Sequence, residues 1–93
     1  MNSQVIITGT ITCAPDELEM FLSAVVQHQA LTLAEPGCLA FSIAQSSPGS
    51  CDFLVSERFV DQAAFEAHTA RTRASDWWEL TKHIPRNLER SGA

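Results

Sequence analysis

The sequence lacks several features that would assign it to a broad class of protein. It has no apolar run near the roughly 20 residues that span a bilayer, and its N-terminus lacks the basic region and apolar core of a signal peptide. It also has no cluster of lysine and arginine, and its net charge of −5 disfavours binding to nucleic acid. These absences predict a cytoplasmic protein that binds neither a membrane nor a nucleic acid.

Cysteine is also scarce. Cys13, Cys38 and Cys51 lack the close spacing of a zinc or redox motif, and their odd number favours free thiols. No histidine pairs with a second ligand at a spacing typical of metal binding. We therefore expect no metal site.

The chain has no long repeat and no low-complexity linker. Its 93 residues are enough for one domain, residues 1–93, and too few for two independent cores. An apolar fraction of 45% with 18% charged residues excludes disorder as the main state. We expect a single globular domain that would gain stability from a partner.

The stretch Glu35-Pro36-Gly37 divides two patterns of apolar residues. Pro36 cannot continue a helix and Gly37 can adopt a positive φ, so a helix end and a turn are predicted here. Apolar residues recur at helical spacing before this turn and alternate after it, with Leu39, Phe41 and Ile43 on one strand face. The predicted elements are strand 4–12, helix 15–33, strand 38–44, strand 52–60, a helix that begins at Asp61, a helical piece 71–82 and a short edge strand 86–90.

This order of elements is typical of the ferredoxin-like split βαβ sandwich, an α+β fold with a four-stranded antiparallel sheet and helices on one face. The expected strand order, 4-1-3-2, brings Cys13 at the end of the first strand close to Cys51 at the start of the third. The second sheet face would remain uncovered, and monomers avoid large exposed apolar patches. We therefore expect a homodimer formed through the sheet faces.

Three motifs follow one another along nearly the whole chain. They are Glu35-Pro36-Gly37-Cys38-Leu39-Ala40-Phe41, Phe53-Leu54-Val55-Ser56-Glu57-Arg58-Phe59 and Asp61-Gln62-Ala63-Ala64-Phe65-Glu66-Ala67-His68. Together they resemble the antibiotic biosynthesis monooxygenase domain. The resemblance implies a dimeric α+β barrel with a pocket between the sheet and helices of each protomer. It also implies oxidation of quinols, anthrones or polycyclic phenols by dioxygen without a metal, flavin or other cofactor, whereas a divergent branch binds and degrades haem.

His68 is the best candidate for the catalytic base, because its ordinary pKa of about 6.5 allows proton exchange near neutral pH. Arg58 is the second catalytic candidate, and Arg58 or Arg86 would stabilise a phenolate through charge-assisted hydrogen bonds. Since two adjacent helical residues point about 100° apart, we expect only one of the two tryptophans to face the pocket. The predicted substrate-binding residues are Trp77, Trp78, Phe65, Phe41 and Arg86.

Each candidate also has a structural interpretation. His68 would then form hydrogen bonds within the helix–sheet interface, and the tryptophans would be core or dimer-interface residues. For Glu57 we expect a structural hydrogen bond or an ion pair with Arg58 or a partner group, and Glu35 is expected to close the turn. The other histidines, expected to be solvated, are His28 and His83.

The sequence departs from the family's pattern at several positions. It has no tyrosine, its first strand lacks the asparagine of the haem-degrading branch, and Thr72 stands where a second histidine often follows the first. Haem degradation is therefore disfavoured. Two functions remain: a monooxygenase acting on a small quinol, anthrone or polycyclic phenol, and a noncatalytic dimeric module that binds an apolar ligand in an accessory or stress-related role.

Overall fold

Four strands form one antiparallel sheet, in the order β2-β3-β1-β4. The computed structural model describes residues 3–92, so Met1, Asn2 and Ala93, which the predicted domain also includes, lie outside the described residues. The observed order confirms the predicted strand order and the ferredoxin-like α+β fold. The strands are β1 (Val5–Thr12), β2 (Cys38–Gln45), β3 (Asp52–Phe59) and β4 (Arg86–Ser91).

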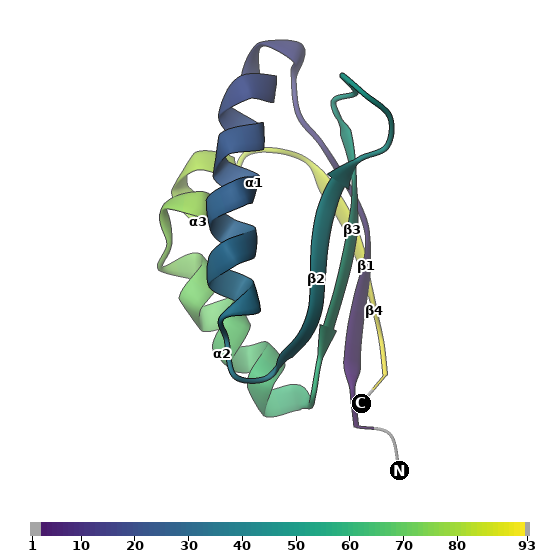
Figure 1. Ribbon diagram of the computed structural model, residues 1–93, viewed down its shortest axis with the longest axis vertical. Helices are drawn as coiled ribbons and strands as arrows, with labels where there is room; N and C mark the ends of the chain where they lie inside the picture. Colours follow the sequence, from purple (N-terminus) through teal and green to yellow (C-terminus); the bar gives the residue numbers. More distant parts are fainter. Residues whose placement is uncertain (1–2, 93) are drawn as a thin grey trace.

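The helices lie together on one face of the sheet, and no described element covers the other face (Figure 1). Asp61 caps the second helix as predicted, because its Oδ1 accepts a 2.8 Å hydrogen bond from the backbone N–H of Ala64. Within residues 3–92, no helix combines the length and apolar character needed to cross a membrane. The helices are a 3-10 turn Pro15–Glu17 (η1), α1 (Leu18–Leu33), α2 (Gln62–Arg73) and α3 (Asp76–Thr81).

The turn between α1 and β2 requires glycine for a reason other than the predicted one. Gly37 is not among the described glycines with positive φ. A Cβ atom at this position would instead clash with the Cβ of Ala64 in α2. The carbonyl of Gly37 also accepts a 2.9 Å hydrogen bond from the N–H of Val60. Glycine therefore allows the turn to pack closely against the start of α2.

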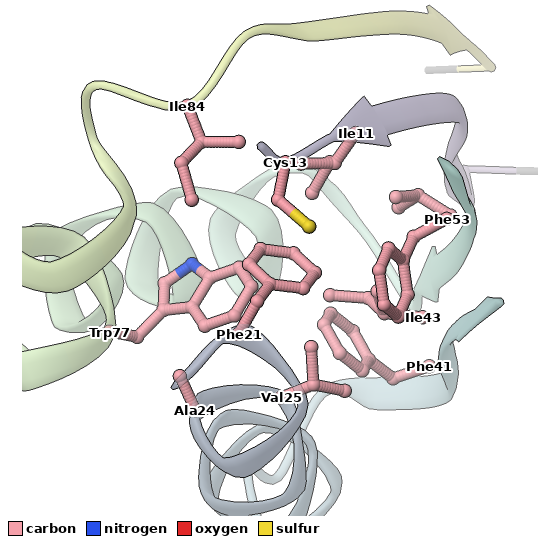
Figure 2. Close-up of a cluster of buried hydrophobic side chains, with 11 residues drawn as sticks. Ile11, Cys13, Phe21, Ala24, Val25, Phe41, Ile43, Phe53, Trp77 and Ile84 are labelled. Atoms are coloured by element: carbon pink, nitrogen blue, oxygen red, sulfur yellow. The ribbon is translucent and has the colours of Figure 1, made fainter. Parts of the chain in front are cut away.

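The main core fills the space between α1, α3 and the sheet (Figure 2). Phe21 lies at its centre, with its ring centroid 4.6 Å from that of Phe53 and 5.4 Å from that of Trp77. Cys13 is buried in this cluster, and its N–H donates a 3.0 Å hydrogen bond to the carbonyl of Cys51. The predicted proximity of Cys13 and Cys51 is therefore confirmed, and the structure has both as free cysteines.

The start of β2 differs from the predicted alternation. Phe41 and Ile43 are buried on the inner sheet face, but Leu39 is exposed. The pairing of β2 with β3 shifts between Cys38 and Ala40, and a bulge of this kind inserts one residue into a strand. The extra residue breaks the period of two, so Leu39 does not share the face of Phe41 and Ile43 as predicted.

Candidate functional site

A cavity of about 310 Å³ lies between the inner face of the sheet and the helices. Its wall is largely apolar because strand residues of the inner rows meet aromatic residues of α2 and α3. The cavity is partly open to solvent, and residues of α2, α3 and β4 contribute to its lining. The apolar part of the wall consists mainly of Ile7, Ile11, Ile43, Phe65, Trp77 and Trp78.

Polar side chains converge at His68, which α2 presents to the inner sheet face. Its Nδ1 atom lies 3.1 Å from Oε1 of Glu35, and its Nε2 atom lies 3.7 Å from Oε1 of Glu57. The Oε2 atom of Glu35 accepts a hydrogen bond from Nε of Arg71. Arg71 also donates a 2.9 Å hydrogen bond to Oγ1 of Thr32. The carboxylate of Glu35 thus orients His68, with Nδ1–H as the donor and Nε2 turned towards Glu57.

Burial shifts the pKa values of Glu57 and His68. Desolvation, followed by the charge of Glu35, raises the pKa of Glu57 to about 7. Desolvation lowers the pKa of His68 below its ordinary value, although Glu35 opposes this shift. Glu57 is therefore about half protonated near pH 7, while His68 is mainly neutral. The pair is able to hold and exchange one proton beside an apolar cavity.

His28 joins the site although it was expected to be solvated, and that expectation was wrong. It is buried, and its ring stacks on Trp77 with centroids 4.4 Å apart and planes within 4°. Desolvation lowers the pKa of His28 to about 3, with smaller contributions from nearby charges that include Arg71 and Arg86. Within the described chain, its Nδ1 atom has no hydrogen-bond partner. Its position three residues after Val25 and seven after Phe21, both buried, is the sequence signal that places it on the inner face of α1.

Most of the predicted site residues meet at this cavity. His68, Phe65 and Arg86 border it, and so do both Trp77 and Trp78, contrary to the expectation that only one would. Phe41 does not line the cavity; it lies beside it, with its ring centroid 5.3 Å from that of His28 and 5.9 Å from that of His68.

Arg58 does not join the site. It follows Glu57 in β3, and successive strand residues point to opposite faces of a sheet. Glu57 is buried on the inner face, so Arg58 is exposed on the outer face, where it pairs across the sheet with Ile6 and Ala40. The expected Glu57–Arg58 ion pair is therefore wrong, and so is the placement of Arg58 as a pocket residue.

Glu57 and Glu35 are the carboxyl groups that the sequence interpretation assigned to structural roles. Phe53, Val55 and Phe59 share a strand face with Glu57, and a carboxyl group in such an apolar row was the available signal. The backbone of Glu35 does close the turn, since its N–H donates a 3.0 Å hydrogen bond to the carbonyl of Thr32. Nothing in the local pattern indicated that its side chain reaches His68.

The comparisons agree with this architecture. A family model described as antibiotic biosynthesis monooxygenase matches residues 4–80. A Nitrosomonas europaea protein provisionally described as an antibiotic biosynthesis monooxygenase is 20% identical, with a TM-score of 0.86 over 100% of this chain and 92% of that one. A protein from Deinococcus radiodurans with the same provisional description is 21% identical, with a TM-score of 0.83 over 96% and 91% of the two chains.

MupZ from Pseudomonas fluorescens also has a similar structure. It is 18% identical, with a TM-score of 0.84 over 99% of this chain and 70% of MupZ. No curated protein matches the chain significantly. At these identities the structural likeness shows a shared fold alone, whereas the family model covers most of the sequence.

Proposed function

Because the chain belongs to the antibiotic biosynthesis monooxygenase family, we propose that it oxidises a small quinol, anthrone or polycyclic phenol with dioxygen. The observation that carries this proposal is the chain of contacts from Glu35 through His68 to Glu57 at the wall of an open apolar cavity. The cavity suits a planar aromatic ring, and the three side chains suit removal of a phenolic proton.

The proposed reaction is balanced by the substrate itself. A quinol loses its two hydroxyl hydrogens and one ring hydrogen, and one of these three hydrogens returns with the added oxygen atom as the new hydroxyl group of a hydroxyquinone. The second oxygen atom leaves as water together with two hydrogens, so the substrate supplies all four electrons. For an anthrone, the reacting methylene carbon becomes a carbonyl and again one water forms. Neither reaction requires an added reductant.

His68 is the proposed base. With Nδ1–H donating to Glu35, the Nε2 atom of His68 carries the lone pair and accepts the phenolic proton. Glu57 then accepts that proton from Nε2, or returns a proton to Nε2. The resulting phenolate is more electron-rich than the phenol, so it passes an electron to dioxygen more readily. The half-buried guanidinium of Arg86 borders the same cavity, and its positive charge favours a ligand that carries negative charge.

A second copy of the chain is the proposed partner, packed through the outer sheet face. This face has no cover within residues 3–92, and it presents Leu54 with 54% of its surface exposed beside small residues such as Ser42 and Ala44. Leu54→Asp should favour the monomer, as measured by light scattering after gel filtration. An unchanged mass for this variant, or a monomeric wild-type protein, would contradict the proposed interface.

Oxygen consumption by purified protein, with autoxidation subtracted, tests the proposed activity. A panel of hydroquinones and anthrones should give protein-dependent consumption that falls by about a hundred-fold or more in His68→Ala, since positioned acid–base groups contribute roughly 10² to 10⁴ to a rate. His83→Ala is the matched control, because His83 is exposed and contacts Glu17 away from the cavity.

Mass spectrometry with labelled dioxygen should find one label in the product. Binding of the panel compounds without oxygen consumption would favour the noncatalytic ligand-binding module. Equal activity in His68→Ala, after its folding is verified, would remove His68 from the proposed mechanism.

A further inference from the structure

The rim of the cavity is positively charged although the chain as a whole carries a net charge of −5. Arg73 at the end of α2 and Arg86 at the start of β4 both border the cavity. Their guanidinium carbons lie 5.3 Å and 5.5 Å from the ring centroid of Trp78. Trp78 is thus an aromatic surface beside two cations, and the cavity has an apolar interior with a cationic edge.

These two cations lack carboxylate partners. Neither Arg73 nor Arg86 forms an ion pair with any acidic side chain of residues 3–92. The nitrogens Nε and Nη2 of Arg86 donate to the backbone carbonyls of Ile84 and Thr81, which are neutral acceptors. Glu89 borders the cavity as well, but it forms no ion pair with Arg73 or Arg86. Arg86 is half-buried whereas Arg73 is exposed, so the lack of an anion is costly mainly for Arg86.

We propose that the natural ligand of the cavity is an aromatic phenol or quinol that also carries a carboxylate, and that Arg73 and Arg86 bind this carboxylate. The inference rests on the proposed function, and it adds a charge requirement to the substrate. Planar guanidinium groups suit a carboxylate because they donate two parallel hydrogen bonds. Partial desolvation lowers the pKa of Arg86 and leaves it charged, which strengthens its attraction for an anion.

The ligand would then have a defined orientation in the cavity. Its carboxylate lies at the rim beside Trp78, and its hydroxylated ring extends inward to His68 and Glu57. The two ends of the site thus have different chemistry: cations at the solvent side and a proton-exchanging pair inside. An uncharged quinol would contact the same apolar wall but would leave both guanidinium groups without an anion.

Binding measured without oxygen tests the inference independently of catalysis. The probes are dihydroxynaphthoic acid and its uncharged methyl ester, titrated anaerobically by calorimetry into the full chain. The acid should bind about ten-fold more tightly than the ester, because its carboxylate forms charge-assisted hydrogen bonds that the ester cannot form, although exposure at the rim weakens them. In Arg73→Gln this preference should fall to about three-fold or less, while affinity for the ester stays within about two-fold.

Lys82→Gln is the matched control, since it removes one positive charge from an exposed residue that pairs with Glu79 and does not border the cavity. This variant should keep the preference for the acid. Equal binding of acid and ester, no binding of either, or a full preference in folded Arg73→Gln would overturn the inference. The last result would leave Arg73 as a cation that only stabilises the end of α2.

Different results would contradict the proposed function and the proposed carboxylate site. Oxygen consumption with the ester and no preference for the acid would keep the monooxygenase and remove the carboxylate site. Preference for the acid without oxygen consumption would keep the carboxylate site and remove the monooxygenase.

Discussion

Nδ1 of His68 lies 3.1 Å from Oε1 of Glu35, although 33 residues separate the two in the chain. This contact joins the turn after α1 to the middle of α2. Arg71, one helical turn beyond His68, binds the other oxygen of the same carboxylate. Glu35 therefore holds the turn against α2 and sets the orientation of the imidazole.

Glu35→Gln tests this contact. The variant should lose about 1.5 to 3 kcal/mol of unfolding free energy, because two charge-assisted hydrogen bonds are weakened at a largely buried position. The pKa of His68 should fall further, since the Glu35 charge raises it. Urea unfolding and an NMR titration measure the two effects. Glu79→Gln is the control, and an exposed pair of this kind contributes at most about 1 kcal/mol. An unchanged His68 titration in Glu35→Gln would contradict the assigned contact.

Glu57 should impose a distinctive pH dependence on stability. Its pKa is about 7 in the folded chain and near the ordinary value of 4.5 in the unfolded chain. Between these values the folded chain binds more protons, so the contribution of Glu57 to stability is fully present below pH 4.5 and is lost as pH rises through 7. Glu57→Gln should abolish this loss, which is on the order of 3 kcal/mol.

The difference in unfolding free energy between Glu57→Gln and wild type, followed by denaturant titration across this range, isolates the effect from other titrating groups. The variant should gain stability relative to wild type as pH rises. A difference that stays constant with pH would show that Glu57 ionises normally in the folded chain.

His28 should change the stability with pH in the opposite direction from Glu57. It is neutral in the folded chain down to a pKa of about 3, whereas in the unfolded chain it binds a proton below the ordinary value of 6.5. The unfolded chain thus binds more protons below pH 6.5, and stability falls by up to about 1.4 kcal/mol per pH unit as pH decreases towards 3. His28→Phe retains a ring for stacking on Trp77 and removes this titration.

Relative to wild type, His28→Phe should therefore become progressively more stable below pH 6.5. Thermal and urea unfolding at several pH values measure the trend. His83→Phe serves as the comparison, because His83 is exposed. Parallel pH profiles for His28→Phe and wild type would contradict burial of a neutral His28.

Gly37→Ala should destabilise the fold through a single steric contact. The added methyl group would clash with Cβ of Ala64, and overpacking of this kind costs about 1 to 3 kcal/mol. Ala64→Gly in the same chain removes the clashing atom and should restore part of the loss. A double-mutant cycle by urea unfolding gives the interaction free energy. Strictly additive effects would show that the two residues do not meet.

Much of the architecture was readable from local patterns. Alternating residues of β1 and β3, the helical spacing in α1 and the break at Pro36 predicted the elements, and their order predicted the sheet. The bulge that exposes Leu39 could not be predicted from the sequence, because it depends on how β2 pairs with β3. The burial of His28 follows from the position of Phe21 and Val25, but its polar side chain had suggested a solvated residue.

By itself, the sequence determined which segments become helices or strands, because this depends on backbone periodicity within a few residues. It also placed His68 near the buried side of α2. Tertiary structure alone decided that Glu35 and Glu57 flank His68 and that Arg86 faces Trp78. Such contacts depend on the distance and angle at which helices pack on a sheet, and these arise from the fit of many side chains at once.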